Sequence, residues 1–98
     1  MDVNHQRKEF DALLTDTKGR MGPLLAKAPD FPPYLSIGRQ LRALSQWTQD
    51  GKLPTREQRL ALDFQVVALR ELESNPNPEV QELVKKLYQL AYDLKRLP

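Results

Sequence analysis

Prolines that stand between helical segments constrain this chain more than any other feature of its sequence. A proline fixes its own φ and disfavours the helical conformation in the residue before it, so helices end at or near such positions. The prolines that divide the chain in this way are Pro29, Pro32, Pro33, Pro54, Pro76 and Pro78. No segment between them alternates apolar and polar residues with period two, so a sheet has no support. The sequence therefore predicts four helices.

The first predicted helix starts near residue 3 and carries an apolar stripe that stays in phase across Gly22-Pro23. This continuity favours a helix that is kinked at Gly22-Pro23 and reaches about residue 28 over one that ends there. Its stripe comprises Val3, Phe10, Leu13, Leu14, Thr17, Met21, Leu24, Leu25 and Ala28. The second predicted helix spans residues 34–50, with Gly51 as its stop. Its predicted core residues are Tyr34, Ile37, Leu41, Leu44 and Thr48.

The third predicted helix, over residues 55–74, begins with a capping box formed by Thr55 and Gln58. Its apolar residues form two stripes on different faces, so the helix is apolar on more than one side. The first stripe is Leu60, Phe64 and Val67, with Glu71 projecting between them, and the second is Leu62, Val66 and Leu69. Such a helix must be wrapped by neighbouring helices or covered by another protein.

The fourth predicted helix starts at Pro78, with Asn77 as its N-cap, and runs to about Arg96. Its apolar face consists of Val80, Leu83, Val84, Leu87, Leu90, Ala91 and Leu94. Short connections between successive helices favour antiparallel neighbours. The predicted fold is therefore all-α, a compact antiparallel bundle of four helices, and residues 1–98 form a single domain.

Several kinds of chemistry lack the residues that they require. The chain has no cysteine, which excludes disulfides, cysteine-type zinc sites and cysteine nucleophiles. Its one histidine, His5, lies on the first predicted turn, and no phosphate-binding loop or nucleophile elbow occurs. We therefore expect no cofactor, no metal and no enzymatic activity.

The net charge of +2 comes from 15 basic and 13 acidic residues spread along the chain, so we expect no nucleic-acid partner. No signal peptide or apolar stretch of about 20 residues occurs, so we expect a cytoplasmic protein that does not bind membranes.

Residues of the types that dominate binding hot spots, together with one unusual glutamate, are the candidates for partner recognition. They are a polar strip on the third helix, formed by Arg56, Arg59, Asp63 and Arg70, together with Glu71 and the edge aromatics Trp47, Tyr88 and Tyr92. Each has a structural alternative, because edge aromatics can complete a core, a charged strip can be a solvated face, and Glu71 can pair with a neighbouring cation.

Three runs of sequence resemble a known family: PPYLSIGRQLRAL, TREQRLALDFQVVALRELE and PEVQELVKKLYQLAYDL. Over residues 31–94 the chain resembles the small helical immunity proteins that protect bacteria from type VI secretion effectors, of the kind paired with NAD(P)⁺ glycohydrolase toxins. The matching positions are Tyr34, Gln40, Leu41, Leu44, Leu60, Ala68, Arg70, Glu71, Leu83 and Tyr88.

The resemblance implies an inhibitor that binds the toxin domain of its cognate effector in the cytoplasm and covers its active site, so that NAD(P) is not hydrolysed. Three alternatives remain open. They are immunity to an effector with different toxin chemistry, a helical adaptor or secretion chaperone for an effector, and a nucleic-acid regulator.

Overall fold

Capping residues and prolines set the ends of the helices in the computed structural model, which describes residues 3–97 and the side chains from His5 onward. The elements are α1 (Val3–Lys27), α2 (Pro32–Trp47), a 3₁₀ turn (Gln49–Gly51), α3 (Arg56–Leu60), α4 (Phe64–Val67), a π-helical turn η2 (Ala68–Leu72) and α5 (Pro78–Arg96). No strand occurs in this part of the chain.

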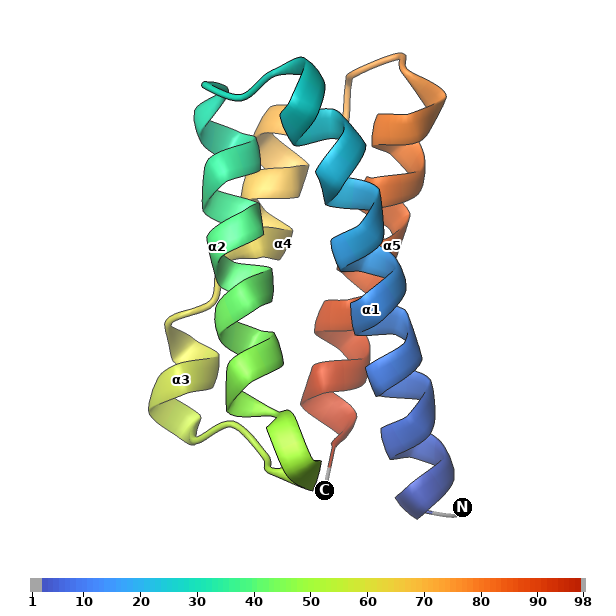
Figure 1. Ribbon diagram of the computed structural model, residues 1–98, viewed down its shortest axis with the longest axis vertical. Helices are drawn as coiled ribbons and strands as arrows, with labels where there is room; N and C mark the ends of the chain where they lie inside the picture. Colours follow the sequence, from blue (N-terminus) through green and yellow to red (C-terminus); the bar gives the residue numbers. More distant parts are fainter. Residues whose placement is uncertain (1–2, 98) are drawn as a thin grey trace.

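The main helices run alternately up and down (Figure 1): α1 up, α2 down, α4 with η2 up, and α5 down. Helix α1 packs against α2 and α5, and α4 packs against the same two helices, so the four form a closed ring of contacts. The short helix α3 lies at the lower end of the ring, beside α2 (Figure 1). The predicted all-α antiparallel bundle is confirmed.

Helix α1 continues through Gly22-Pro23, as the in-phase apolar stripe predicts, and ends at Lys27. It leans across the bundle, so that its last turns lie beside the start of α2 (Figure 1). Its stripe is buried at Phe10, Leu14, Thr17, Met21 and Leu24, and half-buried at Leu13, Leu25 and Ala28. The side chain of Val3, also predicted in this stripe, lies outside the described residues.

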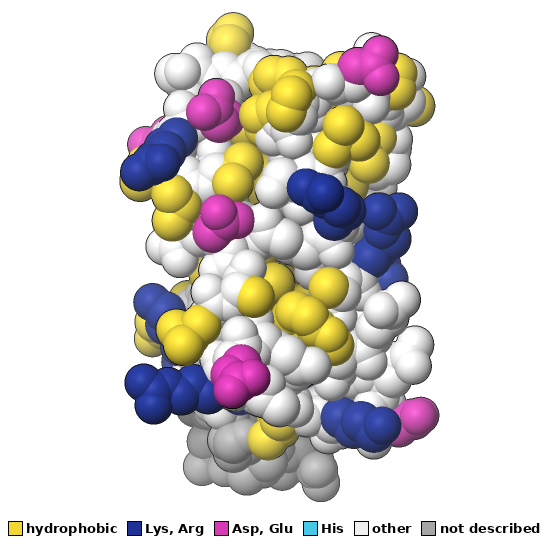
Figure 2. All heavy atoms as spheres, turned by 90° about the vertical axis from the view of Figure 1, so that its left-hand side faces the viewer, with side chains coloured by type: hydrophobic (Ala, Val, Ile, Leu, Met, Phe, Trp, Pro, Cys, Tyr) yellow, Lys and Arg dark blue, Asp and Glu magenta, His cyan; other side chains and the backbone are white. Residues whose placement is uncertain are grey.

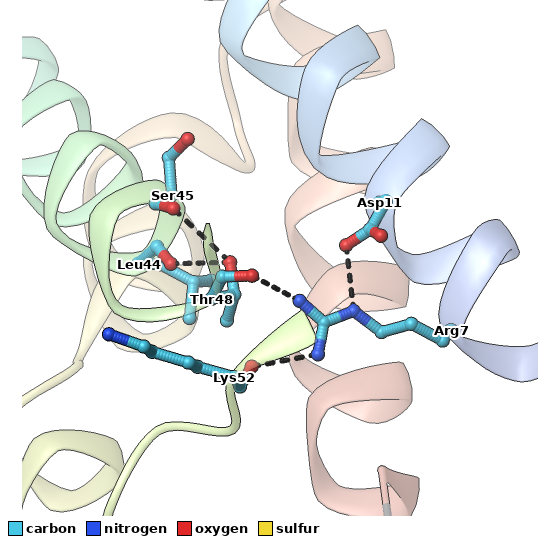
Figure 3. Close-up of polar contacts among 6 residues, drawn as sticks. All are labelled: Arg7, Asp11, Leu44, Ser45, Thr48 and Lys52. Atoms are coloured by element: carbon cyan, nitrogen blue, oxygen red, sulfur yellow. Dashed lines mark hydrogen bonds and ion pairs between the residues drawn. The ribbon is translucent and has the colours of Figure 1, made fainter. Parts of the chain in front are cut away.

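An arginine from α1 holds the lower end of α2 (Figure 3). The last carbonyl groups of a helix have no partner within the helix. The guanidinium of Arg7 donates to the Thr48 carbonyl and, over 2.7 Å, to that of Lys52, and Asp11 accepts a third bond of 3.0 Å from it. Gly51, with φ of 79°, turns the chain there, but α2 has already ended at Trp47, earlier than the predicted end at residue 50.

The prediction of one continuous helix over residues 55–74 is wrong. The capping box of Thr55 and Gln58 is present, but α3 ends at Leu60 and the chain becomes helical again only at Phe64. A side chain of α2 stabilises the break, since the Asp63 amide donates to Gln40 Oε1 (2.7 Å) and Gln40 Nε2 donates to Asp63 Oδ1 (2.6 Å). Gln40 Oε1 thus accepts from a backbone amide that an uninterrupted helix would pair along its own backbone.

The break also overturns the predicted apolar stripe. Leu60 is 74% exposed, and the residues that α4 and η2 bury are Phe64, Ala68 and Leu72, four positions apart. Glu71 consequently lies on the exposed side of η2 and does not project between core residues. Two members of the second stripe, Val66 and Leu69, are 44% and 57% exposed. The helix therefore contacts two neighbours and leaves part of its apolar surface uncovered.

Helix α5 has the predicted boundaries, cap and core face. Asn77 Oδ1 accepts from the Glu79 amide over 2.9 Å, and Pro78 occupies the first turn, where no backbone donor is needed. The buried side chains are Val80, Leu83, Val84, Leu87, Leu90 and Leu94. Ala91 is half-buried beside them.

Candidate interaction surface

Exposed large hydrophobic side chains gather on one side of the bundle, the side formed by α2, α3, α4 and η2. We call it the α2–α4 side, and Figure 2 views the molecule from it. Its exposed hydrophobic residues are Phe31, Leu35, Leu53, Leu60, Val66 and Leu69. Among the described residues, α1 exposes no large hydrophobic side chain, and α5 exposes only Tyr92. Apolar patches rimmed by polar groups are typical of protein-binding surfaces.

The upper part of this side contains a shallow hollow where the start of α2 meets η2. It is lined by Phe31, Pro32, Pro33, Ser36, Val67 and Glu71. The ring of Phe31 packs edge-on against the buried ring of Tyr34, with centroids 4.8 Å apart, so its position is fixed from below. The hollow therefore has an apolar lining with one carboxylate, that of Glu71.

Four charged residues of α2 and η2 have no partner among the described residues. Glu71, Arg39, Arg42 and Arg70 are exposed, and none forms a hydrogen bond or an ion pair through its side chain there. Figure 2 shows basic and acidic side chains interspersed with hydrophobic ones over this side of the molecule. Within the part of the chain that the structure describes, the Glu71 carboxylate is therefore not paired with a cation.

The four residues predicted as a single polar strip are divided between structural and exposed positions. Arg59 bridges two elements, because its Nη1 donates to the Leu94 carbonyl (3.1 Å) and its Nε to that of Pro54 (3.3 Å). Asp63 is bonded to Gln40, as described above. Arg56, on α3, and Arg70, on η2, are exposed. Because the helix breaks between them, the four side chains do not share one helical face.

The candidate aromatics also differ in their surroundings. Trp47 is half-buried at the end of α2, and Tyr92 is 56% exposed with the guanidinium of Arg96 at 5.4 Å from its ring centre. Tyr88 is half-buried, and its hydroxyl donates to Glu73 Oε2 over 2.5 Å. Partial burial, together with the bond to Glu73 and its charge, raises the pKa of Tyr88 to about 12. Tyr88 therefore connects α5 to the end of η2.

A second hollow, of 320 Å³, lies between α3 and α5 and was missed by sequence reasoning. It is lined by Arg56, Arg59, Leu60, Leu62, Phe64, Gln65, Ala91, Leu94 and Lys95. The hollow exists because the chain leaves the helical path after Leu60, and no local pattern in the sequence signals that departure. Leu60 was consequently assigned to the core.

Within residues 3–97, no group of three or more histidine, aspartate or glutamate side chains is arranged to hold a metal ion. In the same part of the chain, no helix has the length and apolar character required to cross a membrane.

Apart from Tyr92, the exposed large hydrophobic side chains of the described residues all belong to the stretch from Phe31 to Leu69. The family model of Tsi6 matches residues 6–96, nearly the whole chain, and the protein therefore belongs to the Tsi6 family of type VI secretion immunity proteins. The match includes α1, whereas the resemblance noted from the sequence covered residues 31–94. No curated protein and no solved structure matches the chain.

Proposed function

We propose that this immunity protein binds the toxin domain of one cognate type VI effector in the cytoplasm and covers its active site. We further propose that this toxin is an NAD(P)⁺ glycohydrolase. Inhibition is stoichiometric and involves no turnover by the immunity protein. The toxin chemistry rests on the resemblance of residues 31–94 to immunity proteins paired with such toxins.

The observation that carries this proposal is the one-sided distribution of exposed hydrophobic side chains. A tight interface needs an apolar centre from which water is excluded, surrounded by polar groups. The α2–α4 side offers both, because Phe31, Leu35 and Leu69 are exposed on the same elements that carry Glu71 and Arg39. Helix α1 has no exposed large hydrophobic side chain among the described residues.

Unpaired charges on this side add specificity. Like charges brought together across an interface are unfavourable, whereas complementary charges accelerate the encounter and fix the register. Glu71 beside Arg70, with Arg39 and Arg42 on the neighbouring helix, forms a pattern of both signs that only a complementary toxin surface satisfies. This explains how a small bundle protects against one effector.

Co-expression tests the proposal. The toxin domain of the cognate effector, which is first identified among the reading frames beside this gene, is produced with and without the protein, and growth and the cellular NAD⁺ and NADP⁺ content are measured. We expect both nucleotides to be preserved, with inhibition of the purified toxin saturating at one molecule per toxin. NAD(P) loss in the presence of abundant folded protein contradicts the proposal. If the protein instead prevents the loss of a different metabolite, toxin binding is supported and the glycohydrolase assignment is wrong.

A further inference from the structure

The hollow between α3 and α5 is separate from the Phe31–Glu71 hollow and combines an apolar lining with a basic rim. We propose that it receives an apolar side chain of the toxin together with a carboxylate next to it in the toxin chain. This inference rests on the proposed function, since it takes the toxin as the partner, and it adds a second, chemically defined contact.

The lining of the hollow is apolar and is held in place by the core. Phe64 and Leu94 are buried, Leu62 and Ala91 are half-buried, and Leu60 stands 74% exposed at α3. Leu60 is the most exposed large hydrophobic side chain in the described part of the protein. Covering apolar surface of this kind contributes to binding in proportion to the area removed from water. The hollow therefore favours an apolar side chain.

Among the described residues, the charges that line the hollow are all positive: Arg56, Arg59 and Lys95 line it, and no Asp or Glu side chain does. Arg56 and Lys95 form no ion pair or side-chain hydrogen bond with any described residue. Two unpaired cations beside an apolar surface attract a carboxylate, because a charge-assisted hydrogen bond is stronger than a neutral one. Charge complementarity therefore identifies an acidic residue adjacent to the apolar one.

Arg59 connects the two walls of the hollow. Its guanidinium spans from α3 to the C-terminal end of α5, where it donates to the Leu94 carbonyl, and it also holds the Pro54 carbonyl. Helix α3 has few other contacts with the bundle, so this bridge positions it. We regard Arg59 as a positioning residue, with Arg56 and Lys95 available for the partner.

A protein segment suits this site better than a small molecule or a nucleic acid. Small ligands are held in clefts that bury most of their surface, whereas this hollow has the largely exposed Leu60 at its edge. Nucleic acids require extended basic tracks that follow the phosphates. Three cations around an apolar surface do not form such a track.

The charge component is tested with the double variant Arg56→Gln/Lys95→Gln, using the full chain and the purified toxin domain of the cognate effector. The matched control is Lys8→Gln/Lys85→Gln, which removes the same charge from exposed positions on α1 and α5 outside the hollow. Calorimetric titration at two salt concentrations should show about 10-fold weaker binding and a shallower salt dependence for the rim variant. The control should differ from the wild type by less than about twofold. Equal weakening of both variants contradicts a local carboxylate contact.

The apolar component is tested with Leu60→Ser, which alters a side chain already largely in water and should leave the melting temperature unchanged. We expect about 5- to 10-fold weaker toxin binding. Wild-type affinity in both Leu60→Ser and the rim variant, with toxin inhibition intact, overturns this inference and leaves the proposed function standing. A wild-type protein that neither binds nor protects overturns the proposed function itself. A dimer without toxin that Leu60→Ser dissociates shows that a second copy occupies the hollow, which also overturns the inference.

Discussion

Helix α5 and the segment from Thr55 to Ser74 have about the same length and both are rich in apolar residues, yet they fold differently. Helix α5 is one regular helix of 19 residues, capped at Asn77 and buried along one face. The other segment is divided into α3, α4 and η2, of five, four and five residues. It leaves Leu60, Val66 and Leu69 exposed.

The comparison shows two uses of hydrophobic residues. In α5 they recur every three or four positions, so one face packs into the bundle and the other meets water. In the segment 55–74 they surround the helix, and a ring of four helices covers only two of its sides. The apolar residues that remain uncovered are available to a partner. Helix α5 thus supports the fold, and α3, α4 and η2 support both the fold and the surface.

The largest expected effect is a loss of stability when a core side chain of α5 is truncated. Leu87 is fully buried, and Leu87→Ala should lower the free energy of unfolding by about 2–5 kcal/mol, since it removes buried methyl groups and leaves a cavity. Urea denaturation followed by circular dichroism measures it. The control Lys85→Ala changes an exposed position of the same helix. A loss below about 1 kcal/mol for Leu87→Ala contradicts the assignment of α5 to the core.

The converse effect is expected in η2, where Leu69→Asp should leave stability within about 0.5 kcal/mol and weaken toxin binding about 10- to 100-fold. Leu69 is 57% exposed, and placing a charge there disrupts an apolar contact. Tyr92→Asp gives the matched comparison, because Tyr92 is 56% exposed but belongs to α5. Toxin titration of both variants shows whether the toxin binds the α2–α4 side or α5. A loss of affinity in Tyr92→Asp alone indicates that the interface lies on α5.

Gln40→Ala sharpens the comparison, because it removes the non-local contact that stabilises the break between α3 and α4. Two hydrogen bonds to Asp63 are lost, and we expect about 1 kcal/mol of destabilisation. Amide hydrogen exchange should increase around Asp63 and remain unchanged in α5. Gln46→Ala, on the exposed side of the same helix, is the control. Unchanged exchange at Asp63 indicates that the break is encoded within the segment itself.

Glu71→Ala tests the glutamate that the sequence placed in an apolar stripe. The side chain is exposed and has no partner among the described residues, so folding should be unaffected. We expect toxin affinity to fall about 3- to 10-fold if its carboxylate meets a cation or donor of the toxin. Glu9→Ala, an exposed carboxylate on α1, should bind normally. A lower melting temperature for Glu71→Ala supports a structural role instead.

The smallest effect concerns Tyr88, which links α5 to η2. The pKa of its hydroxyl is about 12 in the folded protein and about 10 in the unfolded chain. Between these values the folded protein retains a proton that the unfolded chain releases, so the contribution is complete below pH 10 and is lost as the pH rises toward 12. Tyr88→Phe should show a smaller loss of stability over this interval in chemical denaturation at fixed pH. Identical pH dependence in the two proteins contradicts the assigned pKa.

Local patterns predicted the parts of the fold that depend on local interactions. The Asn77 cap, the Thr55–Gln58 capping box and the apolar faces of α2 and α5 are properties of neighbouring residues, and the structure confirms them. The phase of the stripe in α1 likewise predicted that the helix continues through Pro23. The break at Asp63 was missed because its partner Gln40 lies 23 positions earlier in the chain.

The candidate surface was less predictable for the same reason. Residue type alone identified Arg56, Arg70 and Glu71, which the structure finds exposed. It did not indicate that Arg59 and Asp63 are held by backbone carbonyls and a glutamine, because those contacts join distant parts of the chain. The exposure of Leu60 and the hollow beside Lys95 both result from the break between α3 and α4. They could not be predicted because the break itself was not predicted.

The closed ring of helices has a consequence for the timing of biosynthesis. Helix α1 leaves the ribosome first but packs against α5, which leaves it last. Bacterial synthesis at about 5–20 residues per second takes roughly 5–20 s for a chain of this length, and the ring cannot close before α5 emerges. The α2–α4 side therefore gains its rigid support only at the end of translation. A molecule whose synthesis begins at a given moment therefore presents this surface only after that delay, and binding before then relies on molecules that are already folded.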